Sequence, residues 1–250
     1  MGEWLVVLVK SRRGFKHSMA PDKFITLVYN GIVKNEVQTL PRMLASIEDL
    51  VSGYVVVDTG STDGTQQLLE AKGIDVYHRP FDDFGSSRDH ALQLAMNSVG
   101  LPGSTYLLLI DADMVLRMED TSRFFEILRN EDPDVVMITQ RAGTLLYSNV
   151  RLVRASLKAS YTGVTHEYLN YPSPTKLITL PESVVWIEDV GDGGCKGDKL
   201  ERDRRLLENT EQTPRTLFYL AQTYKDLGLT DLAVAVSYTH LRAHETVLDL

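Results

Sequence analysis

The chain has 250 residues, of which 43% are hydrophobic and 24% charged, enough for one large domain or one domain with a small addition. A formal net charge of −8 argues against a nucleic-acid-binding protein, which would carry a basic face. The single cysteine, Cys195, excludes an intrachain disulfide and favours a reducing, cytoplasmic location. The apolar run at residues 4–9 is too short to cross a bilayer, so no transmembrane segment is expected.

The first half of the chain alternates apolar runs with helical patterns. Runs rich in β-branched and aromatic residues predict strands at 24–29, 54–57, 74–78 and 106–110. Helices are expected after Thr39, with Pro41 in the first turn, over 66–72, and from Ser86 or Ser87 to about Met96. This alternation predicts an α/β fold with a mostly parallel sheet flanked by helices, in which ligands bind beyond the carboxyl ends of the strands.

The second half is less regular. Strands are expected at 135–139, 147–153 and 184–187, and an antiparallel arrangement fits them. From Lys199 the pattern becomes helical, and residues 217–233 match one tetratricopeptide-like helix–turn–helix unit. The predicted organisation is a leader (1–22), an α/β domain (23–198), a helical segment (199–236) and a tail (237–250), with a non-native origin as the alternative for leader and tail.

An apolar strand runs directly into two aspartates in the stretch YLLLIDADMVL. On an extended chain Asp111 and Asp113 would point to the same side, where their charges repel unless a cation lies between them or one is protonated. Oxygen ligands suit magnesium or manganese, which leave positions open for phosphate oxygens. The alternative is that one aspartate caps the next turn and the other is solvated.

Asp58 and Arg88 follow strands at the same predicted edge. Asp58 closes the strand VVVD, where it could cap the turn or accept hydrogen bonds from a ribose hydroxyl or a base N–H. Arg88 falls in the first turn of a helix, where a cation opposes the macrodipole and a bound phosphate would reverse that cost. A salt bridge to Asp82, Asp83 or Asp89 is the alternative.

The pair His166 and Glu167 follows the stretch YTGVT. The histidine is a candidate contact for a metal or a diphosphate. The glutamate is a candidate general base, which must reach the hydroxyl of an acceptor. Taken alone, this pair is ordinary.

Together these stretches resemble the family 2 glycosyltransferases with the GT-A fold. The matching pieces are VKNE (33–36), VVVDTGSTDGT (55–65), DFGSSRDHALQLA (83–95), YLLLIDADMVL (106–116) and YTGVTHEYL (161–169). RLVRAS (151–156) fits the branch in which tetratricopeptide helices follow the transferase domain. The resemblance implies a mixed, mostly parallel GT-A-type sheet flanked by helices, a short C-terminal helical hairpin, a nucleotide-sugar donor, usually a UDP-sugar, and Mn²⁺ or Mg²⁺.

Carried over by matching position, the resemblance implies a role for each site residue. Glu167 is expected to be the catalytic base, and Asp113 the direct metal ligand. Further metal contacts are expected from Asp111, His166 and Asp189. Nucleotide-sugar contacts are expected from Lys34, Glu36, Asp58, Arg88 and Asp111.

The sequence departs from the family pattern at two places. Thr59 stands at the second aspartate of the common DDGS version, and Asp189 replaces the histidine of a later I-x-H-x-G motif. Asp189 is therefore the alternative to Glu167 as base. We expect metal-dependent, inverting sugar transfer to the hydroxyl of a glycan, lipid-linked or protein acceptor. The alternatives are a sugar-nucleotidyltransferase-like enzyme, disfavoured by the single glycine in NGIVKNE, and a catalytically degenerate scaffold.

Overall fold

The computed structural model describes residues 24–98, 104–194 and 198–238. The predicted leader, Cys195 and residues 239–250 of the predicted tail lie outside these ranges. Among the described residues, no helix combines the length and apolar character that a membrane span requires.

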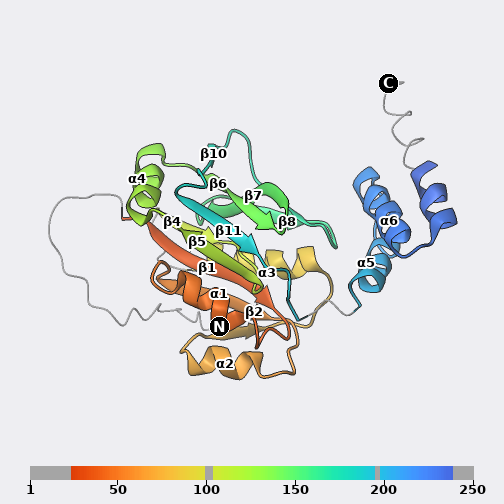
Figure 1. Ribbon diagram of the computed structural model, residues 1–250, viewed down its shortest axis with the longest axis horizontal. Helices are drawn as coiled ribbons and strands as arrows, with labels where there is room; N and C mark the ends of the chain where they lie inside the picture. Colours follow the sequence, from red (N-terminus) through yellow and green to blue (C-terminus); the bar gives the residue numbers. More distant parts are fainter. Residues whose placement is uncertain (1–23, 99–103, 195–197, 239–250) are drawn as a thin grey trace, which may run out of the picture.

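The first half of the chain follows the predicted alternation of strands and helices (Figure 1). The strands are β1 (Thr26–Val33), β2 (Gly53–Asp58), β3 (Val76–His78), β4 (Thr105–Leu108) and β5 (Met114–Met118). The helices are α1 (Leu40–Ile47), α2 (Thr65–Ala71), α3 (Phe84–Met96) and α4 (Thr121–Glu131). Of these, β5 and α4 were not predicted.

The start of α3 differs from the prediction. Asp83 is the N-cap, and its side chain accepts a hydrogen bond from the Ser86 amide at 2.7 Å. The predicted cap at Ser86 or Ser87 is therefore wrong, because both residues already lie in the first turn. An aspartate directly before the first helical residue satisfies the free amides as well as a serine does.

The second half contains six strands and two long helices among the described residues. The strands are β6 (Val135–Ala142), β7 (Leu145–Arg154), β8 (Ser160–Thr162), β9 (Tyr168–Asn170), β10 (Leu177–Thr179) and β11 (Val185–Asp189). The helices are α5 (Lys199–Glu208) and α6 (Pro214–Asp226), followed by helical residues at 230–238. Gly228 has a φ of +75° and turns the chain after α6, where the helix–turn–helix pattern predicted a break.

The strands form one mixed sheet in the order β3-β2-β1-β4-β7-β6-β11-β5, with β10 attached to β6 and a separate β8–β9 hairpin. β1 pairs parallel to β2 and β4, and β2 pairs parallel to β3. The expected antiparallel pairing occurs between β6 and β7, whereas β11 is parallel to β6 and antiparallel to β5. The mixed, mostly parallel sheet flanked by helices is thus confirmed.

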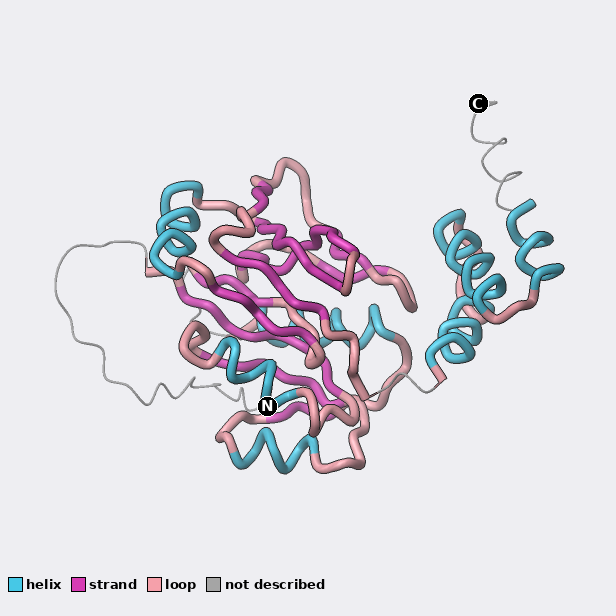
Figure 2. Tube along the Cα trace, viewed as in Figure 1, coloured by secondary structure: helices cyan, strands magenta, loops and turns pink. Residues whose placement is uncertain are grey.

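Both faces of the sheet are covered, which explains the continuous apolar strands. Leu27 and Tyr29 of β1 face one core, which contains the apolar sides of α1 and α4. Val28 between them faces a second core, formed with α3 and the β8–β9 region. Figure 2 shows the strands as a central layer with helices around it.

The helices α5 and α6 lie beside the edge where β1 and β2 end (Figure 1). Leu207 of α5 packs with Leu220 and Tyr224 of α6, and Val164 of the sheet domain joins this cluster. The helical hairpin therefore contacts the sheet domain next to His166 and Glu167.

Candidate active site

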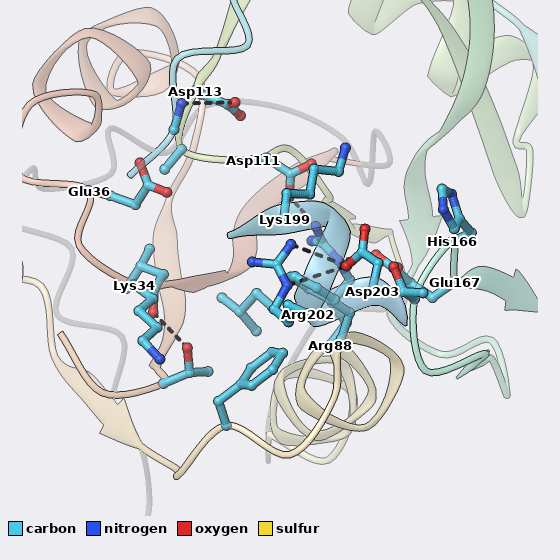
Figure 3. Close-up of a pocket in the computed structure, with 18 residues that line it drawn as sticks. Lys34, Glu36, Arg88, Asp111, Asp113, His166, Glu167, Lys199, Arg202 and Asp203 are labelled. Carbon is cyan, nitrogen blue, oxygen red and sulfur yellow. Dashed lines mark hydrogen bonds and ion pairs between the residues drawn. The ribbon is translucent and has the colours of Figure 1, made fainter. Parts of the chain in front are cut away.

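A pocket of about 360 Å³ opens beyond the carboxyl ends of β1 and β4 (Figure 3). Seven of the nine predicted site residues line it: Lys34, Glu36, Arg88, Asp111, Asp113, His166 and Glu167. Residues that are far apart in the sequence are brought together because β1, β2 and β4 are parallel and end at one edge.

Asp111 and Asp113 lie in a turn between β4 and β5 and not on an extended strand. The turn is closed by the Met114 amide, which donates to the Asp111 carbonyl at 3.1 Å. The expected extended conformation of this segment is therefore wrong, although both aspartates line the same pocket. Asp111 contacts Arg88, whereas Asp113 accepts a hydrogen bond from the Gly193 amide at 3.3 Å (Figure 3).

Arg88 connects the two predicted functional carboxylates. Its guanidinium donates to Asp111 and to Glu167, each at 2.5 Å, and all three side chains are mostly buried. The alternative ion pair with Asp82, Asp83 or Asp89 is wrong. Burial works to lower the pKa of Arg88, but the charges of Asp111 and Glu167 outweigh it and raise that pKa well above its ordinary value.

The pKa of Asp111 reports the same ion pairs. Burial works to raise it, but the charges of Arg88 and Arg151 lower the pKa of this carboxyl below its ordinary value. Arg151 lies 3.9 Å from Asp111 and also donates to the Leu109 carbonyl at 2.8 Å. Asp111 is thus held as a carboxylate between two arginines.

Main-chain contacts fix α3 against the segment that carries Glu167. The Phe84 amide donates to the Val164 carbonyl at 3.0 Å. A Cβ on Gly85 would lie only 2.1 Å from the Gly163 carbonyl oxygen, so this approach requires glycine. The first turn of α3 is therefore held directly against residues 163–167. Arg88 is the fifth residue of α3 and follows this turn, so its expected position in the first turn is wrong.

The carboxylates of Asp113 and Glu36 face a common point next to Gly193. A Cβ placed on Gly193 would lie 3.1 Å from Asp113 Oδ2 and 3.2 Å from Glu36 Oε1. Burial, helped by the charges of Asp113 and Asp111, raises the pKa of Glu36 despite hydrogen bonds from Thr39 and Gly194. The chain thus places the carboxylates of Asp113 and Glu36 close to the same backbone glycine, Gly193.

Asp58 and Asp189 do not line the pocket. Asp58 is 1% exposed, and its Oδ1 accepts hydrogen bonds from the Gly60 and Ser61 amides at 2.8 and 2.9 Å. Its Oδ2 is buried without a hydrogen-bond partner in the described structure. Asp189 ends β11, and its carboxylate accepts a hydrogen bond from the Tyr147 hydroxyl at 2.8 Å.

His166 faces the helical hairpin. Its ring stacks on Tyr219 of α6, with centroids 4.1 Å apart and planes at 3°, and its carbonyl accepts a hydrogen bond from Arg215 at 2.9 Å. Its φ of +50° is uncommon for a residue with a side chain. Burial lowers the pKa of His166, which favours the neutral imidazole. Helix α6 therefore holds the residue that precedes Glu167.

Sequence reasoning missed the contribution of α5 and of two phenylalanines. Lys199, Arg202 and Asp203 line the pocket from α5, and Phe81 and Phe84 line it from the loop before α3 and the first turn of that helix. The i, i+3 spacing of Lys199 and Arg202 was visible in the sequence. It could not be distinguished from the solvated face of an ordinary amphipathic helix.

The oxygen-only side chains of Asp113 and Glu36 suit a hard divalent cation. Within the described residues, however, no three histidine, cysteine, aspartate or glutamate side chains converge as a metal-binding group. The predicted metal set is therefore not assembled: Asp111 is paired with Arg88, His166 stacks on Tyr219, and Asp189 binds Tyr147.

Comparisons with known proteins agree with this fold. The model of Glycosyl transferase family 2 matches residues 32–177. A TPR repeat-containing protein of Synechococcus elongatus is 30% identical over 146 residues, covering 56% of this chain and 34% of that protein. An uncharacterized glycosyltransferase of Rickettsia felis is 26% identical over 166 residues, covering 65% of this chain and 56% of that protein.

A solved structure, that of S. aureus TarS, is similar in fold, with a TM-score of 0.50 and 14% sequence identity. The similarity covers 80% of this chain and 43% of TarS. The chain spans about a third of the cyanobacterial relative and about half of the rickettsial one. Because the family model matches more than half of the chain, and the fold agrees, this protein belongs to glycosyl transferase family 2.

Proposed function

We propose that the protein transfers a sugar from a nucleotide-sugar, with a UDP-sugar as the first expectation, to an acceptor hydroxyl, and that the reaction is metal-dependent and inverting. The observation that carries this proposal is the pocket at the carboxyl ends of β1 and β4. It collects Asp111, Asp113, Arg88 and Glu167 from three different stretches of the family 2 region.

Asp113, with Glu36 beside it, is the proposed protein side of the metal site. A divalent cation bound there would stabilise the negative charge that develops on the leaving nucleoside diphosphate. Lys34 follows β1 and lines the same pocket, where its ammonium lies 5.6 Å from the Phe81 ring. Asp111 is held by Arg88 and Arg151, so we assign it to donor positioning and not to direct metal ligation.

Glu167 is the proposed base. The Nε of Arg88 lies 2.5 Å from Oε1 of Glu167 and orients this carboxylate toward the pocket. The second oxygen, Oε2, would then accept the proton of the acceptor hydroxyl. The hydroxyl oxygen would form a bond to the anomeric carbon as the bond to the diphosphate breaks. The electron pair leaves with the diphosphate, and attack from the opposite face inverts the anomeric centre.

Asp189 is the weaker alternative for this role, because its carboxylate is bound to Tyr147 and lies outside the pocket lining.

Calorimetry with UDP, with and without Mn²⁺, tests the donor and metal parts of the proposal. Wild-type protein should bind UDP in a metal-dependent way, and Asp113→Asn should weaken this binding at least about tenfold. Glu188→Gln is a matched control, since Glu188 of β11 is an exposed carboxylate paired with Arg117 of β5. UDP binding that ignores both the metal and Asp113→Asn would refute the proposed donor site.

Hydrolysis of the nucleotide-sugar tests the base separately from donor binding. Glu167→Gln should bind UDP normally but lose most hydrolysis, a loss of roughly 10²- to 10⁴-fold for a general base. Should Glu167→Gln retain turnover while Asp189→Asn loses it, the base is Asp189.

A further inference from the structure

We propose that α5 forms an anion-binding wall of the pocket, in which Lys199 and Arg202 bind the diphosphate of the donor. The inference rests on the proposed function and adds residues to it. Both residues lie outside the region matched by the family model, residues 32–177, so family membership alone does not assign them a role.

Lys199 and Arg202 lie three residues apart on α5 and therefore share one side of the helix. Both line the pocket that also contains Arg88 and Asp111 (Figure 3). Arg205, one turn further along, is exposed and donates to the Glu201 carbonyl at 3.2 Å. The helix thus presents Lys199 and Arg202 to the pocket, whereas its other two cations, Arg204 and Arg205, lie outside the pocket lining.

Arg202 is held in place before any ligand binds. Its guanidinium lies 4.6 Å from the centroid of Phe84, in cation–π geometry, and 3.3 Å from the carboxylate of Asp203. The Asp203 side chain is only 3% exposed, whereas that of Arg202 is 23% exposed and remains accessible from the pocket. A side chain fixed in this way loses little further conformational entropy when it binds a phosphate.

The charge balance of the pocket favours this assignment. Arg88 is shared between Asp111 and Glu167, and the Asp113–Glu36 side adds two more acidic groups. A diphosphate brings several negative charges into this acidic pocket, so it requires cations besides Arg88. Lys34, Lys199 and Arg202 are the other lysines and arginines that line the pocket, and α5 supplies two of the three. Lys199 is also the first residue of α5, where a cation opposes the helix macrodipole and a phosphate would reverse that cost.

The test compares ligands that share the nucleoside but differ in phosphate content. Calorimetry with UDP, UMP and uridine, in the presence of Mn²⁺, should show weaker UDP binding in Lys199→Ala/Arg202→Ala by roughly tenfold per residue. UMP binding should weaken less than UDP binding, and uridine binding should not change. Arg205→Ala, which removes the same charge from the same helix, should bind all three ligands like wild type.

Two further variants distinguish a loss of phosphate contacts from a folding defect. Lys199→Ala changes only an exposed side chain and should still weaken UDP selectively. Arg202→Lys keeps the positive charge and should recover part of the affinity that Arg202→Ala loses. Unchanged UDP affinity in both Lys199→Ala and the double variant, or an equal loss for uridine, would overturn the assignment.

Pyrophosphate separates this inference from the proposed function. If the wild-type protein binds pyrophosphate through Lys199 and Arg202 but does not bind UDP, the anion-binding wall is supported and the proposed donor is refuted. If UDP binding depends on Asp113 as expected but is unchanged in the α5 variants, the proposed donor is supported and the anion-binding wall is refuted. Binding of neither ligand refutes both.

Discussion

Replacing Arg88 by methionine removes the charge that Asp111 and Glu167 share while keeping most of the side-chain volume. Breaking a fully buried ion pair costs roughly 3–5 kcal/mol, because an uncompensated charge remains. Here the three side chains are 16–26% exposed, and Arg151 still lies 3.9 Å from Asp111. We therefore expect a loss of about 2–3 kcal/mol in the free energy of unfolding. In a chain of this length, that loss lowers Tm by about 4–12 °C.

The loss of stability in Arg88→Met should depend on pH, whereas a loss caused by a packing defect would not. The folded-state pKa of Asp111 lies below its ordinary value of 3.8, so its contribution to stability is present above that value and disappears as the pH falls further. Arg88→Met removes a main cause of the lowered pKa. The stability difference between wild type and variant should therefore be largest at pH 7 and shrink below about pH 4.

Urea unfolding at several pH values measures this difference. Arg117→Met is the matched control, because Arg117 pairs with Glu188 on the surface, where both side chains are 40% or more exposed. Such a pair contributes about 0–1 kcal/mol. Equal losses for the two variants, or a loss for Arg88→Met that does not change with pH, would refute the reasoning.

Three further predictions concern other parts of the molecule. Tyr219→Ala, which removes the ring stacked on His166, should lower donor hydrolysis several-fold without changing UDP affinity, whereas Leu232→Ala, at an exposed site of the helical residues after α6, should change neither. Burial raises the pKa of Tyr106 from 10 to about 12, so stability should fall as the pH rises between these values, and Tyr106→Phe should reduce that fall in urea unfolding. Gly85→Ala should cost about 1–3 kcal/mol in thermal unfolding, and a loss below about 0.5 kcal/mol would contradict the observed backbone contact.

The strand that ends before the aspartate pair was predictable because burial on both faces leaves a local signature. Tyr106 and Leu108 face one core and Leu107 and Leu109 face the other, so every position is apolar. The gathering of Arg88 and Asp111 was also predictable in outline, since parallel strands end at one edge. Glu167 lies between the antiparallel strands β8 and β9, and only the family resemblance implied its place in the site.

The details of the site depend on contacts that local patterns do not encode. The rule that residues i and i+2 point the same way requires an extended chain, and the turn at Asp111 removes that condition. The stacking of His166 on Tyr219 and the reach of Lys199 into the pocket depend on where the helical hairpin docks. Periodicity defines such a helix but does not specify its tertiary partner.

The close approach of Gly85 to Gly163 determines which motions the pocket can make. The Phe84 amide also donates to the Val164 carbonyl. Because both contacts are between backbone atoms, the first turn of α3 and residues 163–167 should move as a single body. Entry and release of substrates would then depend on displacement of the 191–194 loop or of α5. In hydrogen exchange, the Phe84 amide should be protected well beyond the amides of that loop.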